Sequence, residues 1–246
     1  MLIRALKQAV LGLFIFVYYA SVASAGTIGV SPLRLTFEDS NKIESLTVRN
    51  EGTEPVIMQM GILSWSQREG KAVFTATREI IGNPPIFTVP AGGAQIIRVG
   101  LRRTPDAQRE LTYRIILEEV PPPPNSDFSG TQFYMRMSLP VFVLPKVEAK
   151  PILRWRASRT AEGALKINLT NDGNAHIQIK NFMLSLPESA QPWATQQTAD
   201  YVLSDKSRDW ILPVNADYPT PPPGVTLKLV ALTDAGEIEA KVLIEP

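Results

Sequence analysis

The residue types that usually carry out catalysis are scarce in this sequence. It contains one histidine, His176, and no cysteine. We expect His176 at the surface, after a tight turn at the head of a strand, with no neighbours to complete a metal site. Glu118 and Glu119 are adjacent in a predicted strand, so they point to opposite faces and make a poor acid and base pair. The sequence also lacks a phosphate-binding glycine loop and a G-x-S-x-G turn. We expect no enzymatic activity, no metal and no cofactor.

Two arginines suggest a different chemistry, the binding of a carboxylate. Arg34 and Arg114 each interrupt an otherwise apolar, strand-like segment, "GVSPLRLTF" and "TYRIILEEV". A guanidinium group offers a planar fork of donors and a permanent charge, which suits the C-terminal carboxylate of a peptide. The alternative is that each arginine faces water or pairs with a nearby carboxylate, such as Glu118 for Arg114. The residues alone leave both interpretations open.

A segment with alternating apolar residues could supply a surface for a partner. "TQFYMRMSLPVFVLP", residues 131–145, is predicted as one long strand. Its odd positions form an apolar row: Phe133, Met135, Met137, Leu139, Val141 and Val143. Any half-buried antiparallel strand alternates in this way. The length of the row, its adaptable methionines and the proline-rich approach "VPPPPNSDFSG" favour a strand that joins the edge of an apolar partner.

The N-terminal residues predict export. Arg4 and Lys7 precede an apolar run, which is followed by Ala23-Ser24-Ala25, so we expect residues 1–25 to be a secretory signal peptide. No later stretch is long enough for a membrane anchor in the mature chain. The net charge of +1 argues against a nucleic-acid partner. The absence of cysteine excludes a disulfide scaffold.

The remaining sequence predicts an all-β protein of two domains. Short β-rich segments separated by turns, such as "ESLTVRNEG" and "QIIRVGL", run from Ile28 to Pro145 and favour an antiparallel sandwich. After the polar piece "KVEAKP" the same pattern begins again. We therefore expect domains over residues 26–147 and 148–246. The polar region 187–210 is predicted as a loop with one strand near residues 201–203.

In their order and spacing, several motifs resemble the periplasmic chaperones of the chaperone-usher pathway, which assemble pili and other surface fibres. They are "SPLRLTFEDSNK", "LTVRNEG", "NPPIFTVPAGGAQIIRVGL", "YRIILEEVPP" and "LPVFVLP". The resemblance implies two immunoglobulin-like sandwiches in a boomerang arrangement, located in the periplasm. It also implies two partners, pilus or fimbrial subunits and the outer-membrane usher. The long strand would complete the unfinished sandwich of a subunit with Phe133, Met135, Met137 and Leu139.

The resemblance departs from the best-known branch of the family at the carboxylate anchor. That branch uses an arginine on the first strand, which Arg34 matches, and a lysine on the long strand, where this chain has Pro140. Arg114 resembles the replacement in the divergent, or archaic, branch, as does "NDGNAHIQI" in the second domain. The resemblance therefore implies that Arg114, together with Arg34, grips the subunit carboxylate. The main alternative is a secreted structural or adhesin subunit built of immunoglobulin-like domains, and a carbohydrate-binding or hydrolytic protein is a more distant one.

Overall fold

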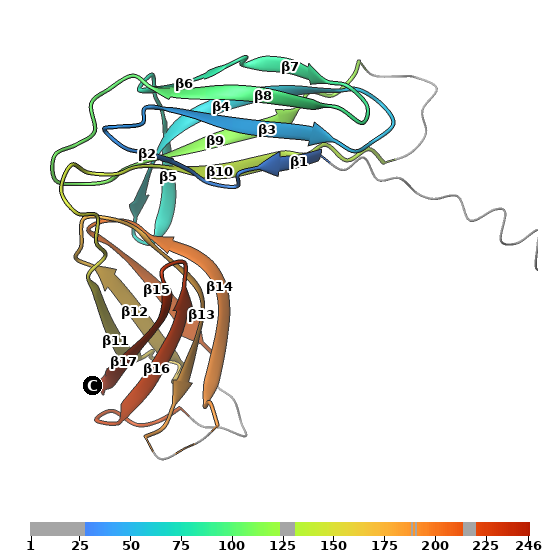
Figure 1. Ribbon diagram of the computed structural model, residues 1–246. Helices are drawn as coiled ribbons and strands as arrows, with labels where there is room; N and C mark the ends of the chain where they lie inside the picture. The colour runs from blue at the N-terminus through green and yellow to red at the C-terminus, as the bar shows by residue number, and fades with distance from the viewer. Residues whose placement is uncertain (1–27, 124–130, 188, 190, 214–219) are drawn as a thin grey trace, which may run out of the picture.

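The computed structural model describes residues 28–123, 131–187, 189, 191–213 and 220–246. Within these ranges the chain is all-β: it forms 17 strands and no helix. The strands make two immunoglobulin-like sandwich domains, β1–β10 and β11–β17, which meet at an angle in a boomerang (Figure 1). The described residues contain no helix long and apolar enough to span a membrane. The predicted fold class is confirmed.

The first domain is a sandwich of two sheets. One sheet has the order β1 (Ile28–Ser31), β3 (Ile43–Asn50), β8 (Ala94–Leu101) and β6 (Ile80–Asn83). The other has the order β2 (Leu35–Phe37), β10 (Arg136–Val143), β9 (Leu111–Glu119), β4 (Val56–Arg68) and β5 (Lys71–Ala76), and β7 (Ile86–Val89) also pairs with β4. Alternate residues of both sheets face inward and form one apolar core that includes Phe37, Leu46 and Ile115.

The second domain is built from a single continuous set of strand pairs. The order is β14 (Ala194–Val202), β13 (Ile177–Ser185), β16 (Thr226–Thr233), β17 (Gly236–Glu245), β11 (Leu153–Arg159), β12 (Leu165–Asn171) and β15 (Lys206–Leu212). The strands enclose a separate core around Ile167, Phe182 and Leu229, all fully buried. Each domain therefore has its own hydrophobic core.

Two predictions about strands were wrong. Residues 187–210, expected to be largely a loop, contain all of β14 and the first part of β15. Only one face of β14 packs inward and its other face carries exposed polar side chains, so its apolar signal is weak. The long strand begins at Arg136 rather than at Thr131. Upstream of Arg136 the chain leaves the sheet, with Met135 still bonded through its carbonyl oxygen to the Glu119 N–H at 2.9 Å.

Both domains use the same turn to close the end of a strand. Asn50 ends β3, and its side chain donates to the carbonyl oxygens of Glu54 and Val89 at 2.7 and 3.2 Å and accepts from the Gly52 N–H at 2.9 Å. Asn171 ends β12 with matching bonds to residues 175, 202 and 173 at 2.7, 3.1 and 3.0 Å. Both asparagines are fully buried. Each side chain satisfies turn and strand backbone groups that would otherwise be unpaired.

Candidate functional site: an open strand edge and a buried arginine

Strand β10 has one fully paired side and one largely open side. It pairs antiparallel with β9 along its whole length, Arg136 to Val143. On its other side it pairs with β2 in parallel, and only through Val141–Val143. The stretch from Arg136 to Pro140 therefore has no neighbouring strand on this side among the described residues. Such an edge can accept a strand from another molecule.

The hydrogen bonds show which backbone groups face the open edge. The Met135 carbonyl oxygen accepts from β9, whereas the Leu144 N–H donates to Phe37 on the β2 side. Backbone groups of odd-numbered residues therefore face β9, and those of even-numbered residues face the edge. Residues 136 and 138 offer both N–H and C=O groups there, and Pro140 offers only its C=O. A proline fits at this position because its missing N–H costs no bond within the sheet.

The apolar row at odd positions 133–143, which continues upstream of β10, runs out of the protein core toward solvent. Leu139 is only 4% exposed and belongs to the core of the first domain. Met137 and Met135 are partly buried against the same core. Phe133 is 89% exposed. The four residues predicted to serve a partner thus form a graded series, in which Leu139 already packs inside its own domain and Phe133 has almost no contacts.

Arg114 lies beside the open edge with its guanidinium group enclosed by aromatic rings. On β9 it is the partner of Pro140. Its Cζ atom lies 3.9 Å from the centroid of the Trp65 ring and 5.4 Å from that of Tyr201. Its Nη1 atom is 3.4 Å from the carbonyl oxygen of Ser138, which faces the open edge. The guanidinium group therefore reaches across β10.

The charge of Arg114 has no carboxylate partner among the described residues. Glu118, the partner suggested by the sequence, instead pairs with Arg136 at 2.7 Å. The Nε atom of Arg114 is buried without a hydrogen-bond partner. Burial lowers the pKa of Arg114 below its usual value, which reflects the cost of keeping a cation there. A half-buried cation that lacks a counter-ion is well suited to bind an anion.

Arg34 approaches the same point of β10 from the other side. It directly precedes Leu35, the first residue of β2, which pairs with Val141, so the backbone of Arg34 comes level with Pro140. Its Nη1 atom lies 2.8 Å from Oδ2 of Asp234 in the second domain. Both predicted arginines therefore lie at the end of the open edge near Pro140, just before β2 begins to pair with β10. One of them already has a carboxylate partner.

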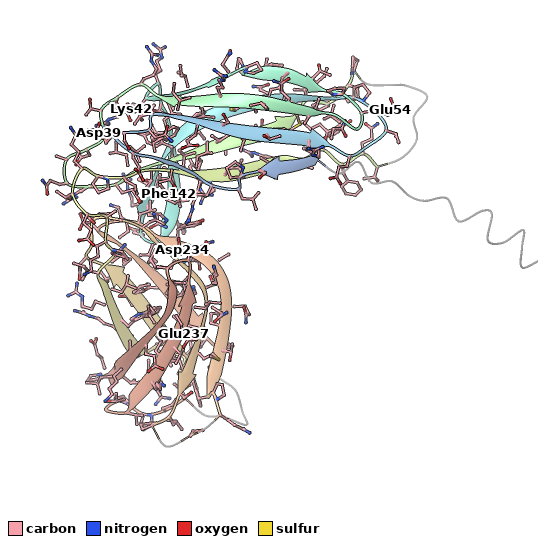
Figure 2. The ribbon with its side chains drawn as sticks, viewed as in Figure 1. Asp39, Lys42, Glu54, Phe142, Asp234 and Glu237 are labelled. Atoms are coloured by element: carbon pink, nitrogen blue, oxygen red, sulfur yellow. The ribbon has the colours of Figure 1, made fainter. Side chains whose placement is uncertain are left out.

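His176 lies in the domain junction, and the prediction that it is at the surface was wrong. Its side chain is 11% exposed and stacks on the Phe142 ring with centroids 3.5 Å apart. Its Nδ1 atom is 2.8 Å from both carboxylate oxygens of Glu110, and its Nε2 atom is 3.5 Å from Asp234 Oδ2. Figure 2 shows Phe142 and Asp234 on facing sides of this junction. No local sequence pattern indicates this contact, because Glu110 and His176 are 66 residues apart.

The pKa of His176 reflects this setting. Burial lowers it, but hydrogen bonds and attraction to Asp234 and Glu110 outweigh burial, and the pKa is raised above 6.5. Burial raises the pKa of Asp234, but its bonds to His176, Gln178 and Arg34 outweigh this effect and lower the pKa well below its usual value. The charged forms of both groups are therefore stabilised together. This cluster joins the two domains.

Gln67 makes a second contact between the domains. Its side-chain amide donates to the Tyr201 carbonyl oxygen at 2.7 Å and accepts from the Leu203 N–H at 3.0 Å. This pair of bonds imitates a backbone strand pair and fixes the end of β14 against β4. It brings the Tyr201 ring to 5.4 Å from Trp65. Gln67, Trp65 and Tyr201 were not predicted as site residues, because nothing in the local sequence pattern shows that they meet.

Comparisons with known proteins agree with this architecture. A sequence model of the family described as "Pili and flagellar-assembly chaperone, PapD N-terminal domain" matches residues 27–148. None of the curated proteins compared matches the chain.

Solved structures of chaperones share the fold of nearly the whole chain. A chain from the CsuC–CsuE chaperone–tip adhesion subunit pre-assembly complex of archaic Csu pili from Acinetobacter baumannii has 22% identity and a TM-score of 0.66, covering 89% of this chain and 100% of that one. A chain from the Salmonella enterica complex of SafA pilin with the SafB chaperone has 13% identity and a TM-score of 0.62, covering 90% and 98%. The E. coli chaperone DraB has 17% identity and a TM-score of 0.57, covering 87% and 98%.

These findings favour a chaperone over the alternative of a fibre subunit. The matching family consists of assembly proteins rather than enzymes. The two-domain architecture is that of the solved chaperones. This chain belongs to the family of chaperones that assemble pili in the chaperone-usher pathway.

Proposed function

We propose that this protein captures pilus or fimbrial subunits by donor-strand complementation, with β10 as the donated strand. The observation that carries this proposal is the open edge at residues 136–140, beside an apolar row that runs out of the core. A subunit that lacks one strand has the complementary needs, an unpaired edge and an apolar groove. The solved structures with bound tip adhesin or pilin support subunits as the partner class.

The arginines define the direction in which a subunit strand would bind. If its C-terminal carboxylate reaches Arg114, its last residue lies level with Pro140. The open edge extends from Pro140 only backward, toward Arg136. The added strand must therefore end where the open edge ends and run parallel to β10. Arg34 lies at the same level and would contribute to the anchor once its bond to Asp234 rearranges.

The apolar row would supply most of the binding free energy. Alternate residues of a strand are about 6.6 to 7 Å apart, so Met137, Met135 and Phe133 can enter successive sites of a groove. Leu139 would mark the inner end of the row, where the subunit core meets the core of the first domain. Each large apolar side chain contributes about 1.5 to 3 kcal/mol when fully buried, before the cost of ordering residues 131–135. These three contacts and a short ladder of hydrogen bonds are enough for capture.

The cellular setting of the proposal follows from the family and from the N-terminus. Residues 1–25 would direct export and be removed, which would leave domains over 26–147 and 148–246 in the periplasm. The captured subunit would pass to the outer-membrane usher, and strand exchange would release it without a cofactor. The partners would not include nucleic acid. The unpaired Arg114 agrees with the archaic branch of the family.

Co-expression with the exported fibre subunits of the same bacterium tests this function. We expect a one-to-one complex on purification from the periplasm. Replacement of both Met135 and Met137 with aspartate should abolish the complex while circular dichroism still shows a folded β protein. Ile43→Asp is a matched control, because Ile43 is an exposed apolar residue on the opposite sheet of the same domain. A complex that survives the double replacement would refute the donated strand.

A further inference from the structure

We propose that the carboxylate site is built by both domains, with Tyr201 of the second domain and Trp65 of the first as positioning residues for Arg114. This inference rests on the proposed function and goes beyond it, because it gives the second domain a direct part in subunit binding. The two rings would hold the guanidinium group with its Nη end toward the open edge of β10. The ligand class is a carboxylate at the end of a polypeptide.

The first line of evidence is the way Arg114 is held. The guanidinium group lies over the Trp65 ring at a separation expected for a cation–π contact, and the Tyr201 ring flanks it. The two rings meet edge to face, with an interplanar angle of 86°. Because Nε is buried without a partner, a ligand must approach the opposite, Nη end. That end is already near Ser138 on the open edge.

The second line of evidence is the position of Tyr201. Burial raises its pKa, whereas the charges of Arg114 and Arg34 act to lower it and that of Asp234 to raise it. Tyr201 therefore lies within the electrostatic reach of both arginines of the site. Its place is fixed by the two hydrogen bonds of Gln67, which is itself almost fully buried. The ring would move away from Arg114 if the domain junction opened.

A titration of Arg114 with acetate tests the inference without a subunit. The mature protein is labelled with ¹⁵N-arginine, and the buried Nε–H signal of Arg114 is assigned by its loss in Arg114→Ala. Sodium acetate is added at constant ionic strength against sodium chloride, so that the shift reports carboxylate binding rather than general anion binding. The wild-type protein should show a saturable shift of this signal.

The variants separate the ring of Tyr201 from its hydroxyl group. Tyr201→Leu should weaken acetate binding about three- to fivefold, the loss expected for one moderate cation–π contact. Tyr201→Phe keeps the ring and should bind within about twofold of the wild-type protein. Gln67→Ala, which releases residues 201–203 but leaves the ring intact, should also weaken binding. It serves as the second variant if Tyr201→Leu does not fold.

Three results would overturn the inference. The first is wild-type acetate affinity in both Tyr201→Leu and Gln67→Ala. The second is an equal loss of acetate affinity in Tyr201→Phe and Tyr201→Leu. The third is the absence of an acetate-induced shift of the Arg114 signal in the wild-type protein. If a one-to-one subunit complex still forms in any of these cases, the chaperone function stands and only the two-domain anchor is wrong. If the titration succeeds and no subunit is captured, the proposed function fails instead.

Discussion

Phe133 offers the most direct test of the donated strand, because its side chain has almost no role in the free protein. It is 89% exposed, so Phe133→Ala removes no core contact and should leave stability within about 0.5 kcal/mol of the wild-type value. Full burial of a phenylalanine in a subunit groove contributes about 1.5 to 3 kcal/mol. The variant should therefore bind a subunit about ten- to a hundredfold more weakly.

A competition assay measures this loss without isolated subunit, which we expect to aggregate. Wild-type and variant chaperones are produced together with a limiting amount of subunit, and mass spectrometry of the purified complex gives their ratio. Phe74→Ala is the matched control, since Phe74 is 47% exposed on β5, at the opposite edge of the same sheet. Equal competition by Phe133→Ala and the wild-type protein would refute our reasoning about the apolar row.

Three further predictions concern the junction, the anchor and the fold. Because the folded-state pKa of His176 is raised above 6.5, its stabilising effect is complete below that pH and is lost as the pH rises through the folded-state value. In urea titrations the wild-type protein should therefore lose stability as the pH is raised above 6.5, and His176→Gln should lose less. Arg114→Ala should weaken subunit capture in the competition assay more than Arg34→Ala, which leaves the unpaired cation in place; the reverse order would argue against Arg114 as the anchor. Asn171→Ala should lower the free energy of unfolding by about 3 kcal/mol, because buried backbone groups lose their partners. Asn168→Ala in the same strand removes an exposed hydrogen bond to the Asp209 side chain, so it should cost less than about 1 kcal/mol, and equal losses would contradict the role of the buried turn.

The sequence predicted those parts of the fold whose signal is local. Alternation along β3 and β9 and the turns at Asn50 and Asn171 indicated an all-β protein, because inward and outward positions follow directly from the strand period. The signal failed in β14, where the outward side chains are polar and the inward ones are mostly small or only partly buried. It also failed upstream of Arg136, where alternation continues although the chain has left the sheet.

The candidate site was predicted in part for the same reason. Arg114 stands out in the sequence as a charge inside an apolar segment. The sequence suggested Glu118 as its partner, but in the structure Glu118 pairs with Arg136, and no carboxylate in the described part of the chain pairs with Arg114. Trp65 and Tyr201 come from different domains, and the bonds of Gln67 to the backbone of residues 201 and 203 help to bring them together. Contacts of this kind depend on how two cores dock, which no local pattern encodes.

The brevity of the open edge has a consequence for the solubility of the protein itself. A long, bare strand edge invites identical copies to stack into sheets. Here the bare stretch spans five residues, with the charge of Arg136 at one end and the missing N–H of Pro140 at the other. In an antiparallel pairing of two copies along this stretch, Arg136 of one copy would face Pro140 of the other, which has no N–H to donate, so few hydrogen bonds could form. Empty molecules would therefore pair poorly with one another, although the same edge would remain open to the subunit strand that we propose it binds.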